Sequence, residues 1–328
     1  YDNLLKTGFL MNYTRNYFLQ SSDFLSLDLI VGDNSRYQFD YFVDKGFYIS
    51  YGVRSRFMQF ERKLNARRLS NYRIEGSELN RMDVEAYDLV NQLYLQTLLG
   101  NGFVFGLGAE HRKIRFDAEQ VYGLSTVVSY AENTHFGSLY SYIKYDSLDN
   151  TFFPTRGVYF SSQFNLYAFA SDMPNFNKFT TGKTELSFAF PLFYKTAARV
   201  NLEGGVTIGG TNVYSLDFFL GGNNKNVFGN YSSFYGYDFL SFGAKNYLKS
   251  EFVVDIEPFK KQHILLLANL AKVDNNLFES FQWHKYPNYS GYGIGYSIDS
   301  FLGPVELKCT YSPEVKQAVW LFNIGYWF

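Results

Sequence analysis

The segment of this sequence that comes closest to a catalytic motif is Gly123-Leu124-Ser125-Thr126-Val127. In lipases and esterases, a serine nucleophile lies in a G-x-S-x-G elbow, whose glycines allow the sharp turn that exposes the hydroxyl. Here Val127 stands in place of the second glycine, and the segment opens a stretch of alternating apolar and polar residues. We therefore interpret Ser125 as part of a strand and expect no catalytic centre in this chain.

Metal and cofactor chemistry find no better support. The four histidines are scattered, without an H-E-x-x-H or C-x-x-C companion: His111, His135, His263 and His284. The single Cys309 cannot form an internal disulfide. The glycines of Gly291-Tyr292-Gly293-Ile294-Gly295 alternate with bulky residues, which is typical of a strand that leaves space for a folded-in loop rather than of a phosphate-binding loop. We expect neither a metal nor a cofactor.

Composition and charge exclude further classes. The formal net charge is -1 and no stretch is dense in Lys or Arg, which argues against a nucleic-acid partner. Aromatic residues make up 20% of the chain, too many for a disordered protein. Charges of both signs lie on the polar faces of the expected strands, which favours cross-strand pairs over an ion-selective ring: Arg54, Arg56, Lys183, Glu185, Arg199, Glu203, Lys249 and Glu251.

Apolar and polar residues alternate with a period of two along the whole chain. The strands that this pattern predicts would position the residues discussed above. In residues 199–208, Val200, Leu202 and Val206 share one face, and Asn201 and Glu203 share the other. This period is that of a strand with one apolar and one polar face. No linker or shift in composition divides the chain, so we expect residues 1–328 to form a single domain. No signal peptide opens the chain, and an exported protein would be represented here as a mature fragment.

Turn signals divide the pattern into sixteen consecutive strands. They include Asp44-Lys45-Gly46, Gly100-Asn101-Gly102 and Glu132-Asn133-Thr134. The connection 210–243 is long, as is 273–289, whereas the connections at the other strand ends are mostly short. The exception is 63–81, which is interpreted as paired strand extensions. Short turns at one end and long loops at the other are typical of an outer-membrane barrel.

A soluble β protein is the alternative, but its polar faces should be richer in charge than the 19% found here. In lipid every backbone N–H and C=O must be paired within the protein, so strands span a membrane only when their sheet closes. We therefore predict an all-β fold: a 16-stranded antiparallel transmembrane β-barrel with long extracellular loops, one of them folded toward the lumen. Its location would be the bacterial outer membrane, with membrane lipids as its surroundings.

The C-terminal strand carries an expected assembly signal. Aromatic and aliphatic residues alternate on one face and the chain ends on an aromatic residue: Trp320, Phe322, Ile324, Tyr326 and Phe328. Outer-membrane assembly machinery recognises a terminal strand of this form, so we expect that machinery to be a partner during biogenesis.

Two groups of motifs resemble those of the outer-membrane insertase and two-partner-secretion superfamily, the BamA-type barrels. One is the turn with Asp146, Asp149, Phe153, Pro154, Arg156 and Gly157, which the resemblance places on the periplasmic side. The other is the pair of loop motifs with Gly221, Gly222, Phe234, Tyr235, Gly236 and Tyr237, which the resemblance folds into the lumen. The resemblance is specific over the second half of the chain and rests on pattern alone in the first.

One residue departs from the family pattern. The family loop motif is Val-Arg-Gly-Tyr/Phe, and its arginine anchors the loop tip to the inner wall. Tyr235 stands at the arginine position and cannot form a charge-assisted fork to a carboxylate. We expect the inward-facing Glu251, Asp255 and Glu306 to lack that partner, which weakens any mechanism that needs an arginine-locked loop.

The motif "FYGYDF" and the C-terminal sequence "FNIGYWF" resemble the C-terminal barrels of patatin-like outer-membrane phospholipases of the Bacteroidota type more than those of the insertases. This resemblance implies a barrel that anchors, and helps to export or orient, a phospholipase domain in the same polypeptide before Tyr1. The alternatives are a BamA-type insertion or translocation pore and a passive porin. The sequence leaves open whether barrels pair as homodimers.

Overall fold

The fold is seen in a computed structural model, which describes residues 8–32, 35–46, 49–65, 81–99, 102–122, 126–173, 175–209, 213–222, 229–279, 282–285, 287–301 and 303–325. Fifteen strands form one sheet in chain order, β1 to β10 followed by β14 to β18, and β11 to β13 form a separate small sheet. None of the helices in these ranges has the length and apolar character to cross a membrane. The all-β prediction is confirmed.

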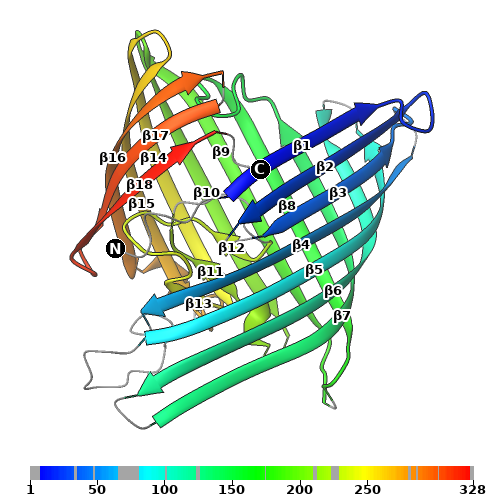
Figure 1. The fold of residues 1–328 in the computed structure, drawn as a ribbon. Coiled ribbons are helices and arrows are strands. Elements are labelled where there is room, and N and C mark those ends of the chain that lie inside the picture. Colours follow the sequence, from blue (N-terminus) through cyan, green and yellow to red (C-terminus); the bar gives the residue numbers. More distant parts are fainter. Residues whose placement is uncertain are drawn as a thin grey trace. The chain divides into compact units, whose positions relative to one another are not determined.

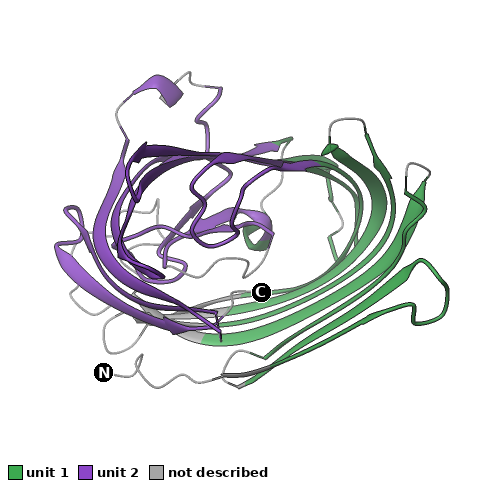
Figure 2. Ribbon diagram, turned by 90° about the horizontal axis from the view of Figure 1, so that it is seen from above, with its two compact units in different colours: residues 1–143, 163–181, 208–215 green, residues 144–162, 182–207, 216–328 purple. Residues whose placement is uncertain are grey.

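Residue contacts divide the chain into two compact units (Figure 2). Unit 1 comprises residues 1–143, 163–181 and 208–215, and unit 2 comprises residues 144–162, 182–207 and 216–328.

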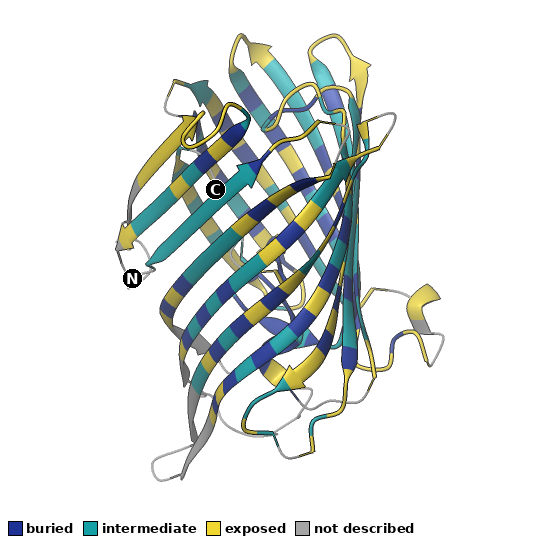
Figure 3. Cartoon of the chain, turned by 90° about the vertical axis from the view of Figure 1, so that its right-hand side faces the viewer, coloured by how far each residue is buried: buried dark blue, intermediate teal, exposed yellow. Residues whose placement is uncertain are grey.

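Unit 1 is built from long antiparallel strands (Figure 1). Its strands are β1 (Gly8–Asn16), β2 (Asp23–Gly32), β3 (Arg36–Val43), β4 (Ser50–Asn65), β5 (Arg81–Leu98), β6 (Val104–Tyr122), most of β7 (Thr126–Asp146) and parts of β8 (Gly157–Ala170) and β9 (Phe179–Phe193). Buried and more exposed positions alternate along much of β4 to β7 (Figure 3), whereas residues 11–16 of β1 are all exposed. β4 and β5 stay paired as far as Asn65 and Arg81, so the expected strand extensions are confirmed over these residues.

The predicted turn at Glu132-Asn133-Thr134 is wrong, because these residues lie inside β7. Glu132 and Thr134 are buried and Asn133 is exposed, which is the alternation of a strand. The buried Glu132 carboxylate accepts a hydrogen bond of 2.7 Å from the Ser215 hydroxyl. The polar side chain of Glu132 therefore makes a contact within the fold and does not indicate a turn. One predicted strand boundary disappears, and the large sheet has fifteen described strands where sixteen are predicted.

Unit 2 contains the rest of β7, β8 and β9 and the C-terminal part of the large sheet. Its other strands are β10 (Thr196–Ile208), β14 (Asn246–Phe259), β15 (Gln262–Asp274), β16 (Tyr289–Ser300), β17 (Gly303–Ser312) and β18 (Gln317–Ile324). The connections alternate in length, as predicted: 194–195 and 260–261 are tight, whereas 209–245 and 275–288 are long. The 3-10 helix η4 (Gln282–His284) lies in the second long loop.

The loop between β10 and β14 has a structure of its own, which the sequence did not predict. It holds the 3-10 helix η3 (Tyr214–Leu216) and the strands β11 (Phe218–Leu220), β12 (Tyr231–Ser232) and β13 (Phe242–Ala244). β11 is the central strand, parallel to β12 and antiparallel to β13. Figure 2 shows segments of this loop on the inner side of the arc formed by the strands of unit 2. We call residues 216–245 the inner loop.

Candidate functional site: a loop folded onto the sheet of unit 2

The inner loop brings its two glycine-containing motifs together. Gly222 and Phe234 form an antiparallel bridge, in which the Phe234 N–H donates 2.8 Å to the Gly222 carbonyl. The Gly222 N–H in turn donates 2.9 Å to the carbonyl of Tyr237. Gly221 and Gly222 have φ values of +133° and +69°, which side chains with a Cβ rarely adopt. The glycines therefore allow the chain to reverse where the two motifs meet.

An apolar core attaches the inner loop to the sheet of unit 2. Phe234 is completely buried, and its ring centroid lies 5.5 Å from that of Phe242. Phe242 stacks on Tyr289 of β16, with 4.1 Å between centroids and 9° between planes. Phe218 packs against Tyr247 of β14 at 5.2 Å. Fully buried aromatic side chains are among the most stabilising groups of a core, so this loop is packed onto the sheet rather than lying free over it.

The tip of the inner loop, residues 235–237, makes backbone-to-backbone contact with the sheet. Gly236 has a φ of +79°, and a Cβ on it would lie 2.6 Å from the Tyr311 carbonyl carbon and 2.7 Å from the Ser312 nitrogen of β17. On β16, a Cβ on Gly291 would lie 2.0 Å from the carbonyl oxygen of Tyr235. Glycine on both sides of the contact is what permits this approach. Gly291 therefore makes room for the loop, as predicted, whereas a Cβ on Gly293 or Gly295 would meet residues of β15 and β17 instead.

The hydroxyl of Tyr235 reaches the carboxylate of Glu251 on β14. Burial raises the pKa of the Tyr235 phenol well above its ordinary value, and the charge of Glu251 adds to the shift, so the hydroxyl keeps its proton and acts as the donor. Glu251 has two cations of the sheet nearby: Arg199 Nη2 and Lys249 Nζ each lie 3.7 Å from its oxygens. Asn201 also donates to it at 2.8 Å.

In place of a loop arginine, the three inward-facing carboxylates have partners on the strands. Besides Glu251, Asp255 lies 2.9 Å from Nδ1 of His263, and Glu306 lies 3.0 Å from Nζ of Lys308. These partners come from the strands themselves and not from the loop tip. The family motif places an arginine on the loop, whereas here Arg199 of β10 brings a guanidinium to Glu251 from the side of the sheet.

A charged network holds β12 of the inner loop. Glu203 of β10 accepts hydrogen bonds of 2.7 Å from the Ser232 hydroxyl and 3.2 Å from Lys249 Nζ. Lys183 Nζ lies 3.1 Å from Glu203 and donates 2.6 Å to the Tyr231 carbonyl. Lys249 also donates 3.1 Å to Ser232. Mixed charges on this face thus form close pairs, as predicted, and the same pairs bind the loop.

The other end of the tip is held by an acidic side chain in the turn between β17 and β18. Glu314 accepts hydrogen bonds of 3.2 Å from the Tyr237 hydroxyl, 2.7 Å from Ser290 and 2.7 Å from Ser312. Burial acts to raise the pKa of Glu314, but the hydroxyl donors Ser290 and Ser312 outweigh it and the pKa is lowered. Tyr237 therefore docks on an ionised carboxylate.

The turn between β7 and β8 is shaped by its own acidic residue. Asp149 accepts from the Thr155 N–H at 2.8 Å, the Thr155 hydroxyl at 2.5 Å and the Arg156 N–H at 3.2 Å. Burial alone would raise its pKa, but the bonds from Thr155 and Arg156 lower it below the ordinary value. Gly157 has a φ of +116°, and a Cβ there would lie 2.3 Å from the Ser147 carbonyl oxygen.

Two further side chains complete this turn. Asp146 accepts 2.9 Å from the Leu148 N–H, and Asn150 accepts 2.8 and 3.0 Å from the N–H groups of Phe152 and Phe153. The backbone is therefore fixed from both ends, and the aromatic residues of the turn have a defined direction.

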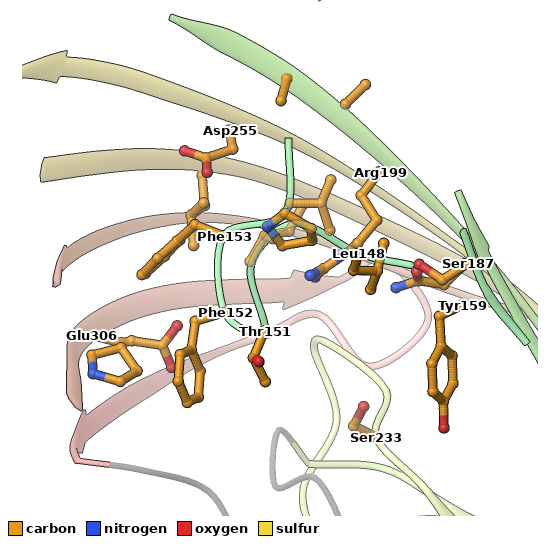
Figure 4. A pocket seen from close by; sticks show the side chains of 18 of the residues that line it. Leu148, Thr151, Phe152, Phe153, Tyr159, Ser187, Arg199, Ser233, Asp255 and Glu306 are labelled. Carbon is orange, nitrogen blue, oxygen red and sulfur yellow. The ribbon is translucent and has the colours of Figure 1, made fainter. Parts of the chain in front are cut away.

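Phe153 is directed at the sheet of unit 2 (Figure 4). Its ring stacks on His263 of β15, with 3.9 Å between centroids and 7° between planes. Phe153 and Pro154 line a cavity of about 280 Å³ whose other walls include Ser233 and Tyr235 of the inner loop. The turn and the loop tip thus border one space. The contact with His263 was missed, since nothing in the sequence marks the two residues as neighbours.

The cavity is polar as well as aromatic. Ser187 and Arg199 line it, and among the described residues the Ser187 hydroxyl and the Arg199 Nε have no hydrogen-bonding partner. Carboxylates of Glu185, Asp255 and Glu306 and the ammonium of Lys308 also lie in its wall. A polar space of this size accommodates several water molecules.

Three predicted features lie elsewhere. Trp320, Phe322 and Ile324 share one exposed face of β18, with 66%, 65% and 56% of their surfaces accessible, whereas Tyr326 and Phe328 lie outside the described residues. Gly123, Leu124 and Ser125 also lie outside them. In the part of the chain that the structure describes, no group of three or more His, Cys, Asp or Glu side chains could hold a metal ion.

A continuous sheet of long strands with an apolar face, together with a loop folded onto its polar face, defines the class of outer-membrane β-barrel proteins. The sequence profile of the OMP85 superfamily matches residues 1–328, and the chain belongs to this superfamily. It is an integral protein of the outer membrane. A comparison with curated protein sequences finds no match.

Two solved structures have the same fold. BamA from Haemophilus ducreyi lacking POTRA domains 1-3 is 15% identical with a TM-score of 0.64, and the match covers 97% of this chain and 69% of that one. CdiB from Acinetobacter baumannii is 12% identical with a TM-score of 0.63, and the match covers 98% of this chain and 57% of that one. The chain thus spans less than two thirds of the CdiB structure. The predicted resemblance to BamA-type barrels is confirmed.

Proposed function

We propose that this chain is the membrane barrel of a BamA-type protein insertion or translocation machine, with an interior path that the inner loop holds shut. Residues 1–328 would form one closed barrel domain with the inner loop in its lumen. The observation that carries the proposal is the contact of the loop tip with β16 and β17, where Gly236 and Gly291 let two backbones meet. A loop built into the wall this closely serves as a plug, and it argues against a passive porin.

In this proposal Tyr235 replaces the arginine of the family loop motif. Its ring packs in a buried cluster with Val253, Leu265 and Leu267, and its hydroxyl bonds to Glu251. A neutral hydroxyl binds a carboxylate less strongly than a guanidinium does, so this lock is weaker and opens at a lower free-energy cost. The remaining holding force comes from the charges around Glu203 and from the aromatic core.

Conductance in planar bilayers tests the plug. The intact protein should show little steady current, and deletion of 222–237 should raise it. A matched deletion of the exposed residues 283–285, which lie in a different loop, should leave the current unchanged. Large open-channel currents from the intact protein would overturn the proposal in favour of the porin.

The patatin-type anchor is the second candidate, and Tyr235 in place of arginine is the observation that favours it. On this reading the barrel anchors or orients a phospholipase domain that precedes it, and the barrel itself is catalytically silent, without metal or cofactor. The sequence encoded before Tyr1 separates the two candidates. A G-x-S-x-G domain would support the anchor, and repeated βααββ periplasmic modules would support the insertion machine.

A further inference from the structure

The apolar face of unit 1 carries rows of side chains that change character abruptly. Val53, Leu93 and Ala109 are register partners on β4, β5 and β6 and form an apolar row. Two residues further along each strand, about 7 Å away, the partners are Ser55, Asn91 and His111, a polar row.

A groove of about 700 Å³ follows the apolar rows. Ala109 has the smallest side chain in its row and leaves a depression beside Leu93, which is 62% exposed. The lining is almost wholly aliphatic and aromatic: Val53, Leu93, Leu107, Ala109, Leu139 and Phe164. On the membrane-facing side of an outer-membrane protein, a groove of this kind matches a hydrocarbon chain in shape and polarity.

The polar row next to the groove ends in two histidines. His111 Nε2 lies 3.0 Å from His135 Nδ1, and the rings stack with 5.3 Å between centroids. This bond uses one nitrogen of each ring and leaves the other nitrogen of each for a further partner. His111 is exposed, and polar groups on a lipid-facing surface are costly unless something polar covers them.

A single cation lies in the next row along β6, with its ammonium over the ring of Tyr87. Lys113 follows His111 on the same face of β6, in the row that pairs with Leu89. The next row holds Arg115, which is 2.7 Å from Asp117 and so is already neutralised. Beyond it, Asp117 pairs in register with Glu85 and forms an acidic border. An anionic group is therefore favoured beside the histidines and Lys113 and repelled further along the strands.

We propose that the groove binds one molecule of a membrane lipid whose phosphate-bearing headgroup has a net negative charge. An acyl chain lies along Ala109 and Leu107, and the phosphate lies beside His111, His135 and Lys113. Two imidazoles and one ammonium match a single anionic headgroup, whereas a protein partner would need a wider set of polar contacts than this narrow row provides. This site is independent of the inner loop and of the proposed function.

Electron paramagnetic resonance of spin-labelled lipids tests the site. The protein is reconstituted in phosphatidylcholine vesicles with trace amounts of labelled phosphatidylglycerol or labelled phosphatidylcholine, and the motionally restricted fraction of each is measured. The variants are H111A/H135A for the headgroup and A109F for the groove. The matched controls are K178A, an exposed loop cation, and A168F, an exposed alanine of β8 outside the groove. The shift in gel mobility on heating shows that each variant is folded.

The intact protein should prefer phosphatidylglycerol by about threefold, the size of one exposed ion pair. H111A/H135A should weaken this preference, and the further substitution K113A should remove it, while the restricted phosphatidylcholine fraction stays unchanged. A109F should lower the restricted fraction of both lipids, and both controls should behave like the intact protein. Equal restriction of the two lipids by the intact protein would overturn the proposal. So would an A109F variant that changes the oligomeric state with lipid restriction unchanged, because the groove would then be a protein interface.

Discussion

Gly291 lies directly beneath the backbone carbonyl of Tyr235, so close that a Cβ on this glycine would come within 2.0 Å of the carbonyl oxygen. The sheet and the loop tip therefore share a contact that any side chain at position 291 of β16 would break. Conversion of Gly291 to alanine should displace the tip, because the neighbouring backbone cannot give way by that amount. Steady conductance in planar bilayers should rise, whereas G229A, a loop position where a Cβ meets nothing within 4 Å, should leave it unchanged. An unchanged current in Gly291→Ala would contradict the tip contact.

Removal of the Tyr235 hydroxyl should loosen the loop without detaching it. In Tyr235→Phe the ring keeps its packing on Val253 and Leu265, while Glu251 loses one donor, a cost of about 1 kcal/mol. Brief channel openings should become several times more frequent than in the intact protein. Tyr292→Phe, at an exposed tyrosine of β16, is the matched control. The lock would be disproved if both variants opened equally often.

The turn between β7 and β8 should depend on pH through Asp149. Because the folded-state pKa of this carboxyl is lowered, the stability it contributes is fully present above its unfolded value and is lost as the pH falls through the folded value. Protease sensitivity of the turn should therefore increase as the pH is lowered below about 4. Asp149→Asn should already be sensitive at neutral pH and change little on acidification. An equally pH-dependent Asp149→Asn variant would show that another group is responsible.

Deletion of Phe328 should reduce insertion into the outer membrane while leaving synthesis intact. The residue ends the alternating series that begins at Trp320, and assembly machinery recognises such a terminal strand. Surface labelling of cells measures insertion, and total protein measured by immunoblotting is the control. Phe301→Ala, at an exposed phenylalanine in the turn between β16 and β17, is the matched variant and should have no effect. Equal surface levels in all three proteins would remove the assembly role.

The strands were predictable because their period of two reflects a physical division between two environments. In β10, the alternation of Val200 with Asn201 carries this information locally, within a few residues. The boundary at Glu132 was not predictable, since a buried carboxylate bonded to the distant Ser215 has the same sequence appearance as a turn. A polar cluster in the sequence can thus indicate either a turn or a contact with a distant residue, and the local sequence does not distinguish the two.

The site was predictable in its motifs but not in its contacts. The motifs around Gly222 and Phe234 identified the loop, and the structure joins them by one bridge. The stacking of Phe153 on His263 and the docking of Tyr237 on Glu314 join residues more than seventy positions apart. Such contacts depend on how the sheet places its strands, which alternation alone does not determine. Arg199 was recognised as an inward charge, yet its position beside Glu251 emerged only from the cross-strand geometry.

The residues that hold β12 have a second consequence once the loop departs. While the loop is in place, Lys183 donates to the Tyr231 carbonyl. The Ser232 hydroxyl donates to Glu203 and accepts from Lys249. After release, those donors and acceptors would face the passage together, both signs within a few ångströms of each other. Under the proposed function, an unfolded segment sliding past would meet a hydrophilic lining of two ammonium groups and one carboxylate, which offers partners to its bare peptide groups.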